Sequence, residues 1–179
     1  DILLLQDTRA TVSDLKGLQY RLNVQANQGR NIRVIGTTQE LDDKMFMVGG
    51  TAIVLFGRAA RYLQSWGAER TTSTGMLTWA RLKNRNDKLL IISTYFPDSD
   101  GERDLREGRK TYAARARHTL QTLATTNRQK GIRTHGTNNP QTWIRSELEV
   151  VCREEGRDAT RGTAEVVVGG DFNMQSDDV

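Results

Sequence analysis

Short, dense apolar runs recur along this 179-residue chain and predict β-strands. Runs at 2–5, 32–35, 51–56 and 89–94 are too short for helices, and polar or turn-forming residues follow them. Residues 75–83 instead alternate between two faces, which is typical of a half-exposed strand in an antiparallel pair. The turn residues 84–87 would then join that strand to the run at 89–94 as a hairpin.

The last apolar run is the most informative of the set. Val166, Val167 and Val168 are apolar at consecutive positions, which predicts a strand buried on both of its faces. Two glycines follow this run, and then come Asp171 and Asn173. Side chains two positions apart in extended chain point the same way, so we expect this strand to present a carboxylate and an amide together at its carboxyl end.

Helices are predicted between these strands. Ser13 can cap a helix that ends near Asn23, and an apolar periodicity marks a second helix at 112–129. Asn139 can cap a third helix, with Pro140 at its first position. The mixture of hairpins and crossover helices predicts an α/β or α+β class, with a mixed sheet or two sheets packed face to face. No linker divides residues 1–179, so we expect a single domain.

Composition adds a preference for an anionic partner. The formal net charge is +4, and most of the 26 basic residues are arginines, whose forked guanidinium suits phosphate oxygens. The single cysteine, Cys152, excludes an intramolecular disulfide within these residues, and a reducing compartment fits that usage. No apolar stretch reaches 18 residues, so the sequence predicts no membrane span.

Polar groups of one chemical kind follow three of the apolar runs. Asp7 follows the first, Tyr95 ends the run at 89–94, and Asp171 with Asn173 follows the valines. If these ends share one rim, the rim holds carboxylate oxygens of the kind that Mg²⁺ prefers. A metal there would polarise a phosphoryl oxygen, while the phenol and the amide could donate hydrogen bonds to phosphate. Taken alone, each of these residues is equally consistent with an ordinary strand or turn residue.

Four segments resemble motifs of the endonuclease/exonuclease/phosphatase superfamily, in the order that the family uses. Residues 1–8 (DILLLQDT) are similar to its "DIL-LQE-T" segment, and 50–55 (GTAIVL) to its "G-x-A-hydrophobic" strand. Residues 93–97 (STYFP) resemble its "x-x-Y-x-P" strand end, and 167–173 (VVGGDFN) its "GDFN" signature. The resemblance spans nearly the whole chain and is nearest in character to the apurinic-type endonuclease domain of non-LTR retrotransposons.

This resemblance implies an α/β fold, a four-layer α/β sandwich of two mixed β-sheets flanked by helices. It also implies phosphodiester hydrolysis that depends on Mg²⁺, with Mn²⁺ as an alternative. Asp7 stands where the family has its metal-binding glutamate, and Tyr95 where it has a phosphate-contacting tyrosine. Asp171 matches the aspartate that orients the attacking water, and Asn173 the asparagine beside the scissile phosphate.

The chain also departs from the family pattern. Asp7 is one methylene shorter than the glutamate, and Asp98 adds negative charge near the phosphate site. Asp98 and Arg103 are further candidates for residues at the substrate phosphate. A first strand with a catalytic asparagine would precede Asp1, and an aspartate–histidine pair would follow Val179.

Neither histidine of the chain replaces that pair. His118 lies in a helical pattern and His135 in a polar loop, and we expect both at the surface. The expectation is therefore a domain truncated at both ends, inefficient or inactive as it stands.

Three functions stay open at this point. The first is a DNA endonuclease of retrotransposon type, fused to or encoded with a reverse transcriptase and acting inside the cell, in the nucleus. The second is a superfamily phosphatase or deadenylase that acts on another phosphoester. The third is a non-catalytic nucleic-acid-binding remnant. Trp66, Trp79 and Trp143 are expected in the core or on sheet faces rather than as base-stacking platforms.

Overall fold

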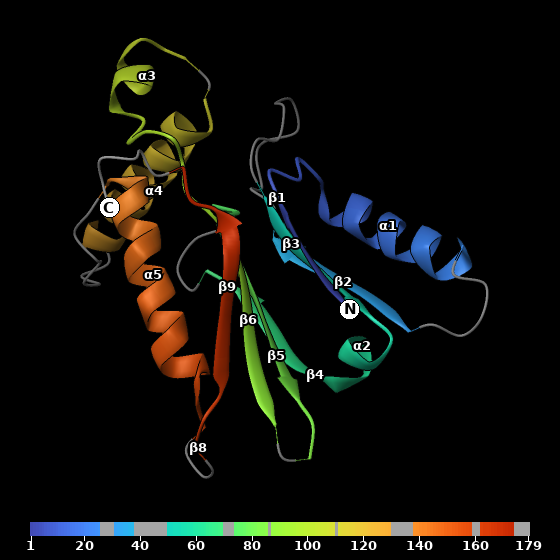
Figure 1. The fold of residues 1–179 in the computed structure, drawn as a ribbon. Coiled ribbons are helices and arrows are strands. Elements are labelled where there is room, and N and C mark those ends of the chain that lie inside the picture. Colours follow the sequence, from blue (N-terminus) through green and yellow to red (C-terminus); the bar gives the residue numbers. More distant parts are fainter. Residues whose placement is uncertain are drawn as a thin grey trace.

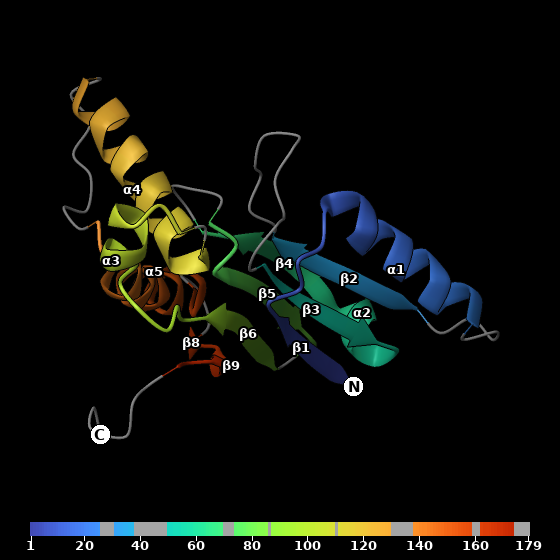
Figure 2. The same cartoon turned by 90° about the horizontal axis from the view of Figure 1, so that it is seen from above.

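The computed structural model describes residues 1–25, 31–37, 50–69, 74–85, 87–109, 111–129, 138–158 and 162–173. In this part of the chain two β-sheets lie face to face and helices cover their outer faces, which makes four layers (Figure 1). The view from above shows the same separation (Figure 2). The α/β class and the two-sheet arrangement predicted from the sequence are thus confirmed. None of the described helices combines the length and apolar character needed to cross a membrane.

The smaller sheet has β3 (Thr51–Phe56) between β1 (Ile2–Gln6) and β2 (Ile32–Thr37). Helix α1 (Val12–Gln25) connects β1 to β2 and packs on β2. Both outer strands pair antiparallel with β3, so this described sheet is antiparallel rather than mixed as predicted. The reason is topological, because β3 inserts between two strands that run parallel to each other. Its central position also explains why residues 52–55 are at most 1% exposed.

The larger sheet is mixed, as predicted. Its order is β4 (Leu63–Ala68), β5 (Leu77–Lys83), β6 (Lys88–Tyr95) and β9 (Glu165–Asp171). β5 is antiparallel to β4 and β6, whereas β6 and β9 are parallel. Parallel neighbours require a long crossover. Helices α4 (Tyr112–Gln129) and α5 (Pro140–Glu155) lie within that crossover and cover the outer face of the sheet (Figure 1).

Four short elements were not predicted. Helix α2 (Arg58–Tyr62) leads into β4, and α3 (Glu102–Arg106) lies in the charged segment before α4. The two-residue strands β7 (Arg157–Asp158) and β8 (Gly162–Thr163) form a small hairpin before β9. The sequence of β4, LQSWGA, has no dense apolar run, and its pairing with β5 is interrupted by a register shift. Tertiary pairing rather than local pattern therefore makes β4 a strand.

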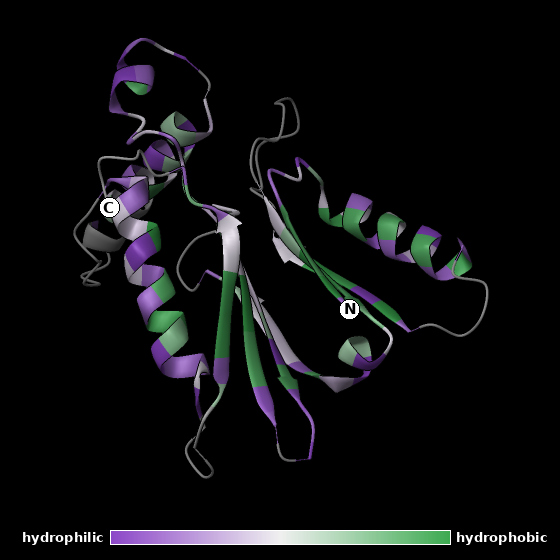
Figure 3. Ribbon diagram, viewed as in Figure 1, coloured by the Kyte–Doolittle hydropathy of each residue, from purple (hydrophilic) through white to green (hydrophobic). Residues whose placement is uncertain are grey.

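Two apolar clusters hold the layers together, and β6 contributes to both. Ile91 faces the space between the sheets with Ile53 and Leu55, whereas Leu90 and Ile92 face α4 and α5. This follows from the two-residue period of a strand that is apolar on both faces. Figure 3 shows the apolar residues along β3, β6 and the first half of β9. The cluster that contains Leu90 and Ile92 also includes buried side chains of these helices: Tyr112, Ala116, Leu120, Trp143, Ile144 and Val151.

The predicted burial of the valine run is wrong. Val166 is 42% and Val167 50% exposed, because β9 is an edge strand of its described sheet and has a neighbour on one side only. β1 is likewise an edge strand, and Ile2 and Leu3 at its start are 39% and 48% exposed. The apolar runs do form strands, but apolar composition alone does not distinguish an edge strand from a central one.

Candidate active site

The parallel pairing of β6 and β9 sets the core of the predicted rim. In their register Tyr95 pairs with Asp171, so the two residues are neighbours at the carboxyl ends of adjacent strands. The backbone N–H of Phe96 donates to the carbonyl oxygen of Asp171 at 2.8 Å and extends the pairing by one residue. Open α/β sheets bind ligands at such strand ends.

β1 reaches the same rim from the other sheet. The Gln6 side-chain amide donates to the Ser93 hydroxyl at 3.2 Å, and that hydroxyl donates to the carbonyl of Leu5 at 3.1 Å. Glycine allows the approach, since a Cβ added at Gly169 would lie only 2.4 Å from Leu4 Cδ1. These contacts hold the end of β1 over β6 and β9 and deliver Asp7 to the rim.

The pKa of Tyr95 is shifted both by burial and by nearby charged residues. Its pKa is raised above the ordinary value, first by partial burial and then by the negative charges of Asp7, Asp171 and Asp98. A smaller opposing effect comes from hydrogen bonding with the Asn173 side chain. The phenol therefore stays protonated at neutral pH and can donate to an anion. Four of the five other candidate residues predicted from the sequence therefore affect the pKa of Tyr95.

Asn173 is held in a defined turn. Its backbone lies in the left-handed region, with φ at 42°, and its N–H donates to Asp171 Oδ1 at 3.2 Å. Its side-chain amide donates to the carbonyl of Phe96 at 2.7 Å. The predicted carboxylate and amide are thus present together, although the chain leaves extended geometry between them. The sequence pattern is also that of an Asx turn, so the same residues form a turn and belong to the candidate site.

Asp7 makes an ion pair that was not predicted. Arg9 Nη2 lies 3.0 Å from Asp7 Oδ2, and Arg9 Nε donates to the same carboxylate. Both residues have left-handed backbones, with φ of 47° and 46°. The Asp7 carboxylate also raises the pKa of Arg9. A guanidinium therefore stands where the resemblance implies a metal ion. The only sequence signal for it is a basic residue two positions after the acid.

The donor chemistry of the rim fits Mg²⁺, although no ready cluster of ligands exists. Asp7, Asp98 and Asp171 supply hard carboxylate oxygens, and the charge of each raises the pKa of Tyr95. In the described part of the chain, however, no group of three or more His, Cys, Asp and Glu residues is arranged to hold a metal ion. Mg²⁺ commonly uses one or two carboxylates and completes its shell with water and substrate phosphate. The residues present meet that smaller requirement.

A buried network behind the rim was missed by sequence reasoning. Glu69 is 8% exposed, and its Oε1 accepts from the Thr74 hydroxyl at 2.8 Å and from the backbone N–H groups of Met76 and Leu77. The Met76 carbonyl accepts the N–H of Tyr95 at 2.8 Å. Glu69 therefore holds the peptide that anchors Tyr95. Burial raises the pKa of Glu69 to about 7.

Tyr112 closes this network on the other side. Its hydroxyl donates to the carbonyl of Thr74 at 2.9 Å, and its ring meets the ring of Tyr95 edge to face at a centroid distance of 5.0 Å. Such aromatic pairs contribute about 0.5–1.5 kcal/mol beyond area burial. Burial raises the pKa of Tyr112 well above its usual value, so this phenol stays a donor. Tyr95 is thus held by both its backbone and its ring.

The remaining candidates lie apart from the rim. Arg103 belongs to α3, has a side chain 80% exposed, and pairs with Glu107 at 2.9 Å. No contact of Arg103 with Tyr95, Asp7 or Asp171 occurs among the described residues, and its predicted role at the phosphate stays untested. His118 is exposed on α4, whereas His135 lies outside the described residues.

Comparisons with known proteins concern the fold. No protein-family model and no curated protein sequence matches the chain. The human Nocturnin catalytic domain with bound sulfate anion is similar at 14% identity and a TM-score of 0.48, over 98% of this chain and 52% of that one. TDP2 from C. elegans is similar at 16% identity and a TM-score of 0.42, over 100% of this chain and 40% of that one.

A truncated TDP2 from C. elegans gives 15% identity and a TM-score of 0.44, over 100% of this chain and 51% of that one. The chain therefore spans about half, or less, of the length of these solved chains.

Proposed function

We propose that the rim is the site of a Mg²⁺-dependent phosphodiester hydrolase that acts on DNA, of the retrotransposon endonuclease type. One observation carries the proposal: strand pairing places Tyr95 beside Asp171 at the carboxyl ends of β6 and β9. The negative charges of Asp7, Asp98 and Asp171 all raise the pKa of the Tyr95 hydroxyl. A protonated phenol amid oxygen ligands for a cation is suited to binding a phosphate whose negative charge the cation offsets.

The residues then take complementary parts. Tyr95 and Asn173 would donate hydrogen bonds to the phosphate oxygens, and Asp171 would orient the attacking water and accept its proton. Asp7 would hold Mg²⁺, which when bound polarises a phosphoryl oxygen. Asp98 would lie beside the phosphate. The net charge of +4 favours approach of a polyanion such as DNA.

Plasmid relaxation tests this function, because one nick per molecule is enough to be detected. With Mg²⁺ or Mn²⁺ the 179-residue chain should relax supercoiled plasmid slowly, and EDTA should stop the reaction. Tyr95→Phe should lower the rate about 10-fold or more, since it removes one donor to the developing charge. Tyr20→Phe is the matched control, because it deletes an exposed phenol hydroxyl on α1 that takes no part in the rim. Equal rates for wild type and Tyr95→Phe would contradict the assignment.

The ion pair between Asp7 and Arg9 favours a second candidate, a nucleic-acid-binding protein without catalysis. If Arg9 competes with the metal, Arg9→Gln should tighten Mg²⁺ binding several-fold, because it removes the positive charge that pairs with the Asp7 carboxylate. Calorimetric titration with Mg²⁺ measures this, and Arg103→Gln is the control for loss of an exposed arginine. Absence of Mg²⁺ binding in both variants would favour the non-catalytic candidate.

A further inference from the structure

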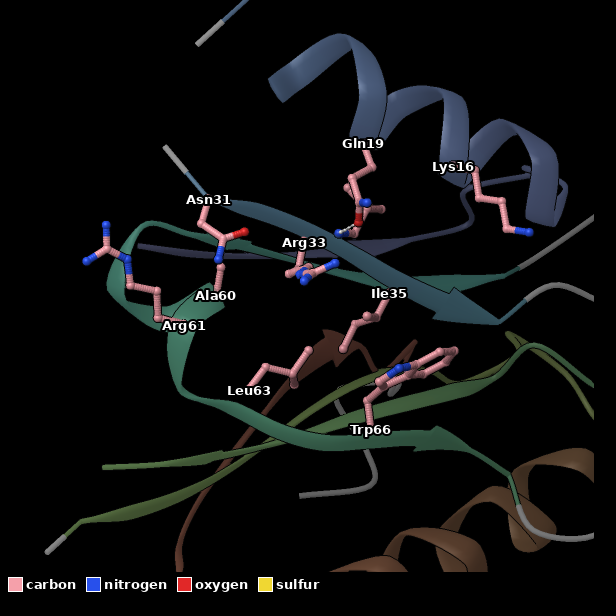
Figure 4. A pocket seen from close by; sticks show the side chains of 10 residues that line it. Lys16, Gln19, Asn31, Arg33, Ile35, Ala60, Arg61, Leu63 and Trp66 are labelled. Atoms are coloured by element: carbon pink, nitrogen blue, oxygen red, sulfur yellow. Dashed lines mark hydrogen bonds between the residues drawn. The ribbon is translucent and has the colours of Figure 1, made fainter. Parts of the chain in front are cut away.

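A groove opens on the side of the sandwich formed by β2 and β4, the two edge strands opposite β1 and β9. Its volume is about 610 Å³. Figure 4 shows that α1, β2, α2 and β4 all contribute side chains to it. Those that matter for its chemistry are Lys16, Gln19, Arg33, Arg61, Leu63 and Trp66.

The groove is distinct from the rim. At the rim end of the smaller sheet, Gln6 and Thr37 both pair with Thr51. Arg33 lies toward the other end of β2, opposite Leu55, and α2 follows β3 at that same end. A ligand in this groove would therefore occupy a face of the molecule that the rim residues do not form.

Trp66 reaches the groove because of an irregularity in β4. The register shift between Leu63 and Ser65 places Leu63 opposite Leu82 and Trp66 opposite Ala80, so both side chains face the space between the sheets. Leu63 packs against the cluster between the sheets, whereas Trp66 lies at its border and is 50% exposed. Trp66 is thus on a sheet face, as expected from the sequence, but with half of its surface open.

Three cationic side chains line the same groove as this indole. Lys16, Arg33 and Arg61 are exposed, and none of them pairs with an acidic residue in the described part of the chain. Among the described residues, no carboxylate belongs to the lining. Gln19 accepts the N–H of Val34 at 2.9 Å through its side-chain oxygen, which leaves its NH₂ group as a donor. The groove therefore combines positive charge, amide donors and one exposed aromatic face.

We propose that this groove binds a segment of single-stranded nucleic acid, with a base stacked on Trp66 and backbone phosphates on Arg33, Arg61 and Lys16. Aromatic platforms beside cations that follow the backbone are the recurring means of holding single strands. Pockets for small organic ligands typically measure about 300–1,000 Å³, so a volume of about 610 Å³ has room for a base and its phosphate rather than an ion alone. The groove would bind single-stranded nucleic acid whether or not the rim catalyses phosphodiester hydrolysis.

Binding of fluorescein-labelled dT₁₂ to the full chain in EDTA tests the electrostatic part, since no divalent metal is then present for the rim. Arg33→Gln/Arg61→Gln should weaken binding and reduce the slope of log K against log salt by about 1.4, or about 0.7 for each lost phosphate contact. Arg58→Gln/Arg85→Gln removes two exposed arginines that do not line the groove and should keep the wild-type slope. An unchanged slope in the groove variant would overturn the proposal.

A second experiment tests whether a base stacks on Trp66. Trp66→Ala should weaken dT₁₂ binding about 5- to 150-fold, the range expected for one stacked base, and Trp66→Phe should retain most of the affinity. Binding should quench the intrinsic fluorescence of the wild type and not that of Trp66→Phe, in which the less exposed Trp79 and Trp143 remain. Full affinity in Trp66→Ala, or equal affinity for duplex DNA or phosphatidylserine vesicles, would overturn the proposal, since neither ligand offers a free base.

Discussion

Asp171→Asn is expected to lower Mg²⁺-dependent nicking about 10²- to 10⁴-fold, the range for losing a positioned general base. The substitution removes the charge and the basicity of the side chain. It keeps an oxygen that can accept the N–H of Asn173, which the carboxylate accepts at 3.2 Å in the wild type. Because the turn survives, the loss reports on chemistry rather than on local folding. Single-turnover plasmid relaxation with excess protein measures it.

Asp87→Asn is the matched control for this experiment. Asp87 is exposed in the turn before β6, at the end of that strand opposite Tyr95. The same isosteric change there should leave the rate within about threefold of wild type. A rate for Asp171→Asn equal to that of Asp87→Asn would remove Asp171 from the catalytic assignment and with it the proposed hydrolysis at this rim.

Glu69→Gln is expected to change how stability depends on pH. Burial raises the folded-state pKa of Glu69 to about 7 from an ordinary value of 4.5, so the folded protein holds this proton when the unfolded chain has lost it. The contribution is fully present below pH 4.5 and is lost as the pH rises through about 7. A shift of this size corresponds to about 3 kcal/mol of unfolding free energy across that window.

Glutamine resembles the protonated acid and does not titrate, so the variant should lack this loss. Urea unfolding at pH 4.5, 6 and 7.5 measures the free energy of unfolding, and the difference between wild type and variant isolates the group. Glu165→Gln, at an exposed position of β9, should follow the wild-type profile. If Glu69→Gln and wild type lose stability in parallel, then Glu69 titrates normally and is not desolvated as the structure indicates.

The hydrophobic pattern predicted where the strands lie better than it predicted how deeply each strand is buried. Every apolar run that was expected to be a strand is one, because short runs of mostly apolar residues ended by turn residues have few other ways of being buried. Whether a strand is central or at an edge depends on pairing with distant residues. The exposed Val167 and the fully buried Ile53 therefore look alike locally.

The rim was predictable because strand ends of one sheet meet at one edge, so Tyr95 and Asp171 could be placed together from the sequence. The residues that hold the rim in place could not be predicted in this way. Glu69 is a charged residue in a polar segment and carries no sign that it will be buried under Met76. Arg9 was missed for a similar reason, because its pairing with Asp7 depends on two successive departures into left-handed backbone.

Three non-glycine residues of the described chain have left-handed backbones: Asp7, Arg9 and Asn173. All three lie at the rim. Such conformations cost about 1–3 kcal/mol each, and glycine would relieve that cost. Replacing Asp7 or Asn173 by glycine should therefore relieve the backbone cost while deleting a side chain of the proposed site. The molecule gives up conformational stability at the place where its chemistry is concentrated, so selection for thermal stability alone would be expected to erode this rim first.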